Sequence, residues 1–100
     1  MDRTVITTLN DTLGWFDRDA AESWDEDTYW DGNNTISRAT GSQWEHETLY
    51  RTRSGRWVLE TTSAYQDSWS EITPERAAKW LLRNDHDDPR VAREIAELEV

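Results

Sequence analysis

Alternating apolar and polar residues predict the strands of this chain. Residues 3–9 (RTVITTL) are rich in β-branched side chains, which favours a first strand. The stretch 44–62 (WEHETLYRTRSGRWVLETT) has two such runs on either side of a turn, which predicts a β-hairpin. Shorter runs at 35–39 and 68–72 predict two further strands.

The turn of this hairpin determines which residues face each other. A type I turn over Arg53 and Ser54, followed by Gly55 in the left-handed conformation, suits the sequence. A two-residue turn fits less well, because Ser54 itself would need that conformation. The preferred turn predicts the pairs Tyr50–Val58, Leu49–Leu59 and Arg51–Trp57. The two Leu side chains and the Trp then share one face, which we assign to the core.

Three segments, 17–24, 74–84 and 89–98, have the apolar spacing of helices. Each has a typical N-cap residue, and the second and third helices carry a proline at their first position. The N-caps are Asp17, Thr73 and Asp88. The order of elements predicts an antiparallel sheet with helices gathered mainly on one side. We therefore expect a small two-layer α+β domain over residues 1–100.

Composition favours a folded domain that depends on its aromatic residues. The chain has a formal net charge of -10 and a mean hydropathy of -0.98, both of which favour disorder. Against this, 7 Trp, 3 Tyr and 1 Phe supply large areas for burial. With no cysteine, disulfides and cysteine-ligated metal or redox centres are excluded. No apolar run reaches the length of a membrane span and no signal region is evident, so we expect a cytoplasmic protein.

The charge has three interpretations. Acidic residues number 21, and Lys79 is the single lysine among 11 basic residues. This balance suits a proteome adapted to high salt, and it also suits a GC-rich genome, whose codons favour Arg over Lys. Alternatively, a dense acidic surface imitates the phosphate backbone and occupies a nucleic-acid-binding protein. Direct, non-specific binding to nucleic acid is disfavoured by the same charge.

The segment 25–34 (DEDTYWDGNN) resembles a calcium loop in composition. If Gly32 takes the sixth position of an EF-hand loop, Tyr29 takes the third and Arg38 the twelfth, where a carboxylate is needed. The template fails, and we interpret the segment as a solvated acidic loop with an Asp-Gly turn. A looser cation site stays an alternative, and no metal ligands are assigned.

No group of residues indicates catalysis. His46 lies between two Glu residues on a predicted strand, so neither neighbour shares its face. His86 lies in the short acidic segment between the second and third predicted helices. Neither His has a second His or a Cys at metal-ligand spacing. No Ser or Thr has the pattern of a nucleophile elbow. We therefore predict no catalytic residue, no cofactor and no enzyme activity.

Two surface groups suggest binding. Seven Trp residues are too many to bury in so small a domain, and two of them lie in or beside loops near the acidic segment. The predicted protein-binding residues are Asp25, Asp27, Trp30, Asp31 and Trp44. An alternative nucleic-acid-binding group of cations and a stacking aromatic surrounds the hairpin turn. It consists of Tyr50, Arg51, Arg53 and Arg56.

The segments LYRTRSGRWVLE and EITPERAAKWLL resemble the central part of a group of small, functionally uncharacterised prokaryotic proteins from accessory or mobile-element settings. In that group, a strand of the type LYRT-x-x-G-x-W-hydrophobic-L precedes a helix of the type E-I-T/S-x-x-x-A-x-x-W-L. The upstream FDRDAAES is similar to the group's segment in which an acidic turn starts a short helix. The resemblance implies a small mixed fold and transfers no activity and no functional residue.

We therefore expect a small, acidic, non-enzymatic protein that binds another macromolecule, in the first place a protein. A role as an inhibitor or modulator encoded on a mobile element, with a basic nucleic-acid-binding protein as partner, suits the size and charge. One alternative is a nucleic-acid-binding module that uses the hairpin turn. The other is a cation-binding domain that uses 25–34. We expect no membrane contact, and the sequence leaves the oligomeric state open.

Overall fold

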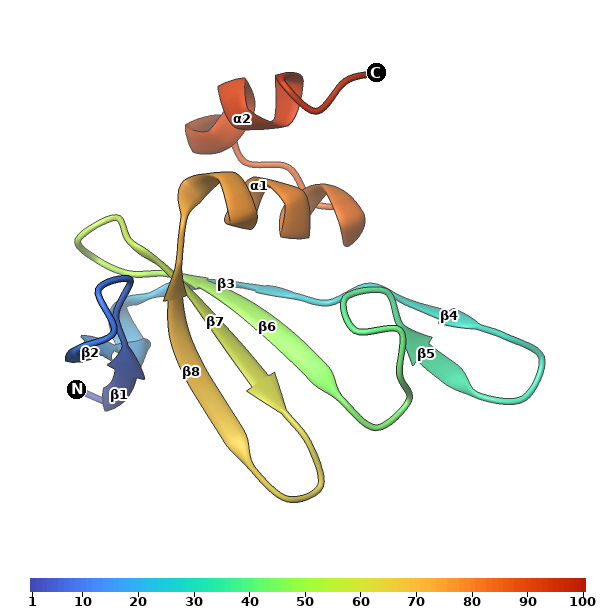
Figure 1. Ribbon diagram of the computed structural model, residues 1–100, viewed down its shortest axis with the longest axis horizontal. Helices are drawn as coiled ribbons and strands as arrows, with labels where there is room; N and C mark the ends of the chain where they lie inside the picture. Colours follow the sequence, from blue (N-terminus) through green and yellow to red (C-terminus); the bar gives the residue numbers. More distant parts are fainter.

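The structure, a computed structural model, describes residues 1–100 and is built on a curled six-stranded sheet of order β2-β1-β8-β7-β6-β3 (Figure 1). Its strands are β1 (Arg3–Thr7), β2 (Leu13–Asp17), β3 (Glu22–Asp25), β6 (His46–Arg51), β7 (Trp57–Thr62) and β8 (Asp67–Ile72). Neighbouring strands are antiparallel, except that β1 meets β8 in parallel. A separate two-stranded sheet pairs β4 (Thr28–Trp30) with β5 (Thr35–Ser37).

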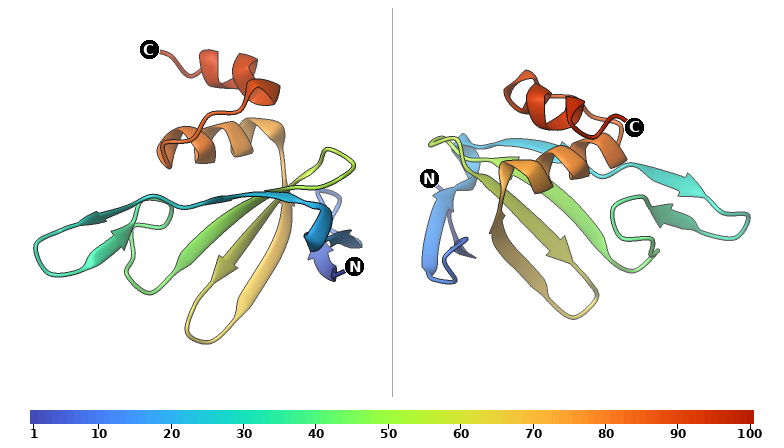
Figure 2. Two further views of the ribbon diagram at one scale, coloured as in Figure 1. Left: turned by 180° about the vertical axis from the view of Figure 1, so that it is seen from behind. Right: turned by 45° about the horizontal axis from the view of Figure 1, so that its top comes forward.

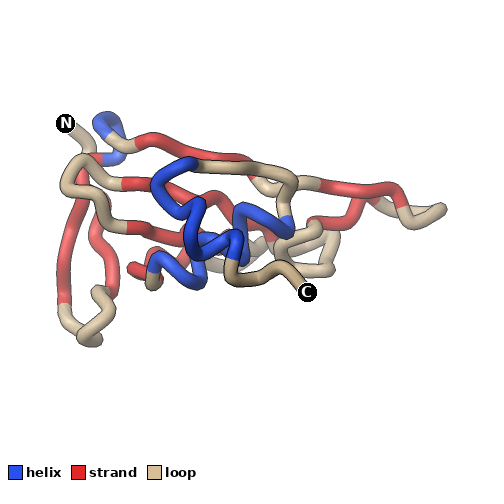
Figure 3. The backbone as a smooth tube through the Cα atoms, turned by 90° about the horizontal axis from the view of Figure 1, so that it is seen from above, coloured by secondary structure: helices blue, strands red, loops and turns tan.

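The helices lie on one side of the six-stranded sheet (Figures 1 and 2). Helix α1 (Pro74–Arg83) crosses the sheet, and α2 (Ala92–Ala96) packs against α1. Two short 3-10 turns, η1 (Arg18–Ala20) and η2 (Pro89–Val91), complete the structure. Viewed from above, the helices cover the central strands, while β1–β2 and β4–β5 lie at opposite ends of the molecule (Figure 3). The predicted α+β class, with helices gathered on one side, is confirmed.

The β6–β7 hairpin has the predicted register. Tyr50 faces Val58, and the neighbouring pairs follow the same alignment. Gly55 has a φ of 87°, the left-handed conformation that the preferred turn requires. The Arg56 amide donates to the Thr52 hydroxyl at 3.0 Å, and the Thr52 amide donates to the Arg56 carbonyl at 2.8 Å. Turn chemistry therefore fixes which residues of the hairpin reach each face.

The main core lies between this hairpin and α1. Leu49, Trp57 and Leu59 are buried on the helix-facing side, as predicted, and Trp80 packs onto them with 6% of its surface exposed. The Trp80 indole Nε1 donates to the Glu47 carboxylate at 3.1 Å, so its polar atom is satisfied at the edge of the core. The main core thus combines two buried tryptophans, Trp57 and Trp80, with aliphatic side chains from the sheet and α1.

A smaller cluster lies on the opposite face of the sheet. Phe16 and Ile6, from the β1–β2 hairpin, cover Val58 there, while Tyr50 and Trp69 border them. The rings of Phe16, Tyr50 and Trp69 lie 5.4 to 5.8 Å apart in tilted arrangements. The curl of the sheet thus lets its own N-terminal strands form part of a second core.

The predicted helix 17–24 is wrong. Asp17 does cap a helical turn, since it accepts the Asp19 amide at 3.1 Å, but that turn is the short η1. Trp24 instead belongs to strand β3, faces Leu49 of β6 and packs against Trp57 with ring centroids 5.5 Å apart. As a residue of strand β3, Trp24 covers the outer edge of the β6–β7 hairpin and joins the main core. A short helix facing solvent would do neither.

Three smaller expectations also need correction. The six-stranded sheet is mixed, not purely antiparallel, because Thr7 of β1 pairs with Ser70 of β8 in parallel. The expected strand 35–39 ends earlier and belongs to the separate β4–β5 sheet. The expected helix 89–98 begins as a 3-10 turn and ends near Ala96. Helix 74–84 is confirmed, with Thr73 as its N-cap.

Asp88 links the C-terminal segment to the sheet. Its side chain is 5% exposed, caps η2 by accepting the Arg90 amide, and forms an ion pair with the Arg90 guanidinium at 2.6 Å. Arg90 also pairs with Glu22 on β3. The hydrogen bond from the Arg90 side chain holds the pKa of Asp88 below its usual value, although burial opposes this shift. The ionised carboxylate therefore contributes to folding stability.

Trp80→Ala should lower the free energy of unfolding by about 3 to 5 kcal/mol, the range for a truncated core aromatic. Urea denaturation monitored by far-UV circular dichroism measures this change. Trp44→Ala provides the control, because that side chain is 71% exposed and its loss should cost little. Equal effects of the two substitutions would contradict the assignment of Trp80 to the core.

Asp88→Asn should cost about 1 to 2 kcal/mol at pH 7, because asparagine preserves the cap and removes the charge. Since the native pKa of Asp88 is lowered, its contribution is present above the unfolded-state value near 4 and is lost as pH falls through the native value. The difference between the two proteins should therefore shrink between about pH 5 and pH 2. Urea titrations at several pH values test this, with exposed Asp87→Asn as the control; a pH-independent difference would refute it.

Candidate binding surfaces

The β4–β5 sheet forms an arm that stands out from the end of the main sheet (Figures 1 and 3). Its pairs are Thr28–Ser37, Tyr29–Ile36 and Trp30–Thr35. Gly32, with a φ of 107°, gives the tip a conformation that side chains rarely allow. The segment expected to be a solvated loop is therefore a short hairpin. Two paired strands hold its aromatic residues in defined positions.

The base of the arm is fastened to the body by partly buried hydrogen bonds. The Asp27 amide donates to Asn84 Oδ1 at 2.9 Å, and Asn84 in turn donates to the Trp80 carbonyl at the end of α1. The Glu26 carboxylate accepts the Ser37 hydroxyl at 2.8 Å and the Glu47 amide at 2.6 Å. These bonds connect the arm to both α1 and β6, which restricts its motion relative to the body.

The acidic side chains of residues 25–34 do not converge on one point. Asp31 accepts the amides of Asn33 and Asn34 at 2.8 and 2.7 Å, and these bonds lower the pKa of its carboxyl, with that from Asn34 contributing most. Asp27 forms an ion pair with Arg38 at 3.2 Å. Asp25 is exposed, and its side chain forms no hydrogen bond or ion pair. No three His, Asp or Glu side chains are arranged to hold a metal ion.

Two tryptophans beside these acids are open to solvent. Trp30, on β4, is 67% exposed, and Trp44, in the loop before β6, is 71% exposed. Tyr29 lies on the other face of β4, where the Arg38 guanidinium covers its ring at 4.7 Å. Large indole surfaces are costly to leave in water, and interface cores are enriched in Trp. The structure thus places both predicted tryptophans where a partner can reach them.

The alternative group around the β6–β7 turn is dispersed. Tyr50 is packed into the smaller core, and Arg51 lies over the Trp57 ring at 5.1 Å on the opposite face. Arg56 makes a two-point ion pair with Glu71, with both bonds at 2.7 Å. Arg53 alone remains exposed without an ion pair. The four residues therefore present no shared surface on which bases could stack between cations.

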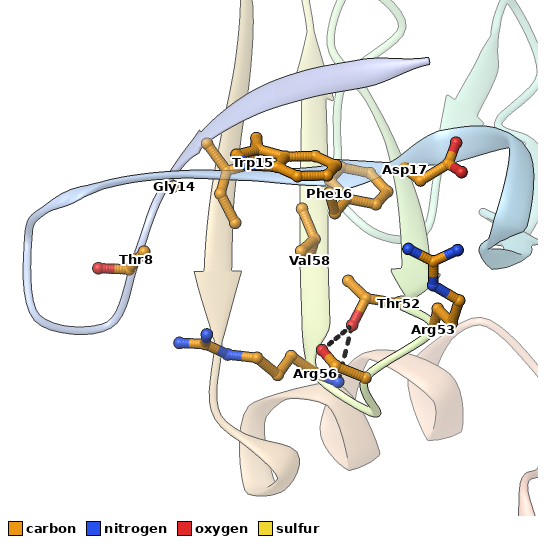
Figure 4. Close-up of a pocket in the computed structure, with 11 residues that line it drawn as sticks. Thr8, Gly14, Trp15, Phe16, Asp17, Thr52, Arg53, Arg56 and Val58 are labelled. Carbon is orange, nitrogen blue, oxygen red and sulfur yellow. Dashed lines mark hydrogen bonds between the residues drawn. The ribbon is translucent and has the colours of Figure 1, made fainter. Parts of the chain in front are cut away.

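A cavity of about 150 Å³ lies between β2 and the β6–β7 turn (Figure 4). Trp15 and Phe16 border it on one side, and Thr52, Arg53 and Arg56 border it on the other. Asp17 lies at its rim but is already bonded to the amides at positions 2 and 19. No His, Cys or Lys lines the cavity.

Both histidines have structural partners. His46 Nδ1 lies 2.7 Å from the Glu26 carboxylate. His86 Nε2 lies 2.6 Å from the Asp25 carbonyl, and its ring stacks on Trp80 at 6.2 Å. Both rings thus bond to the segment that leads from β3 into the arm.

One cationic surface, on α1, was not predicted from the sequence. Arg76, Lys79 and Arg83 are exposed and line a hollow of about 270 Å³ between the helix and the sheet. We call this the basic cleft. Their spacing of three and then four residues places them on one helix face, so the sequence did contain the signal. It was hidden by the dominant acidity of the chain.

Comparisons with known proteins found no relative of this chain. No family model, no curated protein and no solved structure matches the chain. The resemblance to the mobile-element group therefore stays a prediction. The helices of the structure are too short and too polar to span a membrane.

Millimolar calcium should leave the melting temperature unchanged beyond a control of matched ionic strength. The reason is that three of the four acids of 25–34 are bonded to separate partners: Asp31 to backbone amides, Asp27 to Arg38, and Glu26 to Ser37 and His46. Differential scanning fluorimetry with calcium chloride, magnesium chloride and sodium chloride measures this. A saturable rise specific to calcium would contradict it, because a ligand that binds only the folded state stabilises that state.

Proposed function

We propose that this protein is a non-enzymatic binding protein that engages another protein through the β4–β5 arm. The observation that supports the proposal is the exposure of Trp30 and Trp44 at 67% and 71% on or beside an arm fastened to the body. Tryptophans contribute strongly to protein interfaces when a partner desolvates them. An arm held in place by hydrogen bonds also loses little conformational freedom on binding.

The negative charge near the arm indicates what kind of partner surface the arm would bind. Asp25, at the end of β3 just before the arm, is the one predicted acid whose carboxylate has no partner in the fold, and the whole chain carries a charge of -10. A basic protein surface would be drawn to this end of the molecule, mainly through faster association. A basic nucleic-acid-binding protein is such a partner, and occupying its surface would make this chain an inhibitor or modulator.

The proposal is tested with alanine variants of the two tryptophans. Tyr65→Ala is the matched control, because Tyr65 is 97% exposed at a different turn. Affinity capture from nuclease-treated lysate identifies a partner retained by the wild type and by the control. With that partner purified, Trp30→Ala or Trp44→Ala should raise Kd roughly 30-fold, which corresponds to about 2 kcal/mol for a hot-spot aromatic.

Asp25→Lys tests the role of charge without breaking the arm, whereas Asp27 and Asp31 have structural bonds that reversal would disturb. Association should slow, and the effect should fade as salt rises. Binding that survives loss of both indoles would contradict the proposed surface. Capture that disappears after nuclease treatment would instead favour nucleic acid as the partner.

A further inference from the structure

Most basic side chains of the protein already have partners. Five of the 11 form ion pairs, and Arg3 and Arg51 lie over tryptophan rings. Of the remaining four, three are the residues of the basic cleft on α1. With 21 acids in the chain, any of these three could have been neutralised within the fold. They are instead exposed, and no carboxylate lies within ion-pair distance of them.

The cleft also has an apolar floor. Leu59 and Ile72 of the sheet line it, together with Ala39 from the loop that follows the arm. Glu47 is the only acid along the lining, and its carboxylate accepts the Trp80 indole N–H at 3.1 Å. The hollow therefore combines a cationic wall with aliphatic carbons, and its one acid has a structural hydrogen bond.

We propose that the basic cleft binds a short, extended acidic segment of a partner protein, with carboxylates toward α1 and an aliphatic side chain on the floor. This inference concerns a different surface from the arm and does not rest on the proposed function. The proposal rests on charge complementarity, because three unpaired cations that line one hollow attract carboxylates more strongly than the same charges dispersed over the surface would. The overall negative potential opposes approach but is screened beyond about 8 Å at physiological salt.

The dimensions suit a peptide. From Arg76 to Arg83 the helix rises about 10 Å, at 1.5 Å per residue. In an extended chain, residues two apart point the same way and lie about 7 Å from each other. Two carboxylates in the pattern acid–aliphatic–acid would therefore fall within reach of the three cations. The intervening aliphatic side chain would point to the opposite side, toward the floor.

Nucleic acid fits this cleft less well than an acidic peptide. Non-specific single-strand binding relies on exposed aromatic rings for base stacking. Trp80, the one aromatic residue of the lining, is 6% exposed and turns its polar edge to Glu47. A long phosphate chain would also run past the cleft over the rest of the surface, which is strongly acidic because the chain as a whole has a charge of -10.

The Trp80 indole N–H offers a direct readout, because it lies at the cleft. Its NMR signal is identified by its absence in Trp80→Phe. The probes are two capped peptides, Glu-Leu-Glu-Leu-Glu and Gln-Leu-Gln-Leu-Gln, titrated in buffer with physiological salt. We expect a saturable shift of the Trp80 signal with the Glu peptide and at least a tenfold weaker effect with the Gln peptide.

Lys79→Glu and Arg76→Glu should each weaken the binding of the Glu peptide roughly tenfold, because an attraction becomes a repulsion. Arg93→Glu is the matched control: it makes the same charge change on α2, where the side chain is 86% exposed, and should leave Kd unchanged. Circular dichroism melting curves verify that each variant is folded. Both cleft positions are exposed, so the fold should persist.

Four results would overturn the proposal. Equal binding of the Glu and Gln peptides would mean that the cations play no part. Equal loss in Arg93→Glu would mean that net charge alone acts. Tighter binding of a ten-residue oligothymidylate than of the Glu peptide at the Trp80 signal would identify the cleft as a nucleic-acid site. In addition, salt-sensitive self-association in analytical ultracentrifugation, lost in Lys79→Glu, would make the occupant a second copy of this chain.

Discussion

The packing of Trp80 against the β6–β7 hairpin holds the rest of the structure in place. Its ring covers Leu49, Trp57 and Leu59, which fixes α1 across the sheet. Trp80 is also linked to the arm by hydrogen bonds. Its backbone carbonyl accepts a bond from the Asn84 side chain, and Asn84 accepts one from the Asp27 amide at the base of the arm. One aromatic contact therefore sets both the main core and the place where the arm leaves the body.

The acidity of the chain is organised, not uniform. Several acids act inside the fold: Glu26 fastens the arm, Glu71 holds Arg56, and Asp88 caps η2 and binds Arg90. These carboxylates are well buried and have charged or amide donors, which is the condition under which burial of an ionised group is tolerated. Other acids, such as Asp25, remain in water and contribute to the surface potential. Composition counts both kinds together and cannot separate them.

The parts of the fold that sequence predicts are those where local chemistry and packing agree. The hairpin register follows from Gly55, and α1 follows from Thr73 and the apolar stripe that ends at Trp80. Strand β3 was missed because Ala20, Ala21 and Trp24 have helical spacing, whereas the pairing of Trp24 with Leu49 is a distant contact. Non-local pairing overrides weak local preference in short segments.

The binding surfaces were predictable to different degrees, again because contacts between distant residues decide part of the outcome. Exposed tryptophans near loops can be inferred from their excess over what a small core holds, and the structure exposes Trp30 and Trp44. The position of Arg51 beside Trp57 follows from the predicted hairpin register, whereas the Arg56–Glu71 ion pair could not be inferred because it depends on the pairing of β7 with β8. The basic cleft is periodic in the sequence, yet its significance lies in the absence of a carboxylate within ion-pair distance of its three cations, which is a property of the folded chain.

Helix α1 connects the two proposed surfaces. Its C-terminal end bonds to the arm through Asn84, while its exposed face lines the basic cleft, and Ala39 of the cleft follows directly on the arm. A partner that touched both would have to present basic character to the arm and an acidic segment to the cleft. Such an alternating pattern discriminates among partners more sharply than either charge alone, because any displacement along the surface brings like charges together. The fold can therefore supply specificity through the placement of charge on a rigid helix, even though its net charge is strongly negative.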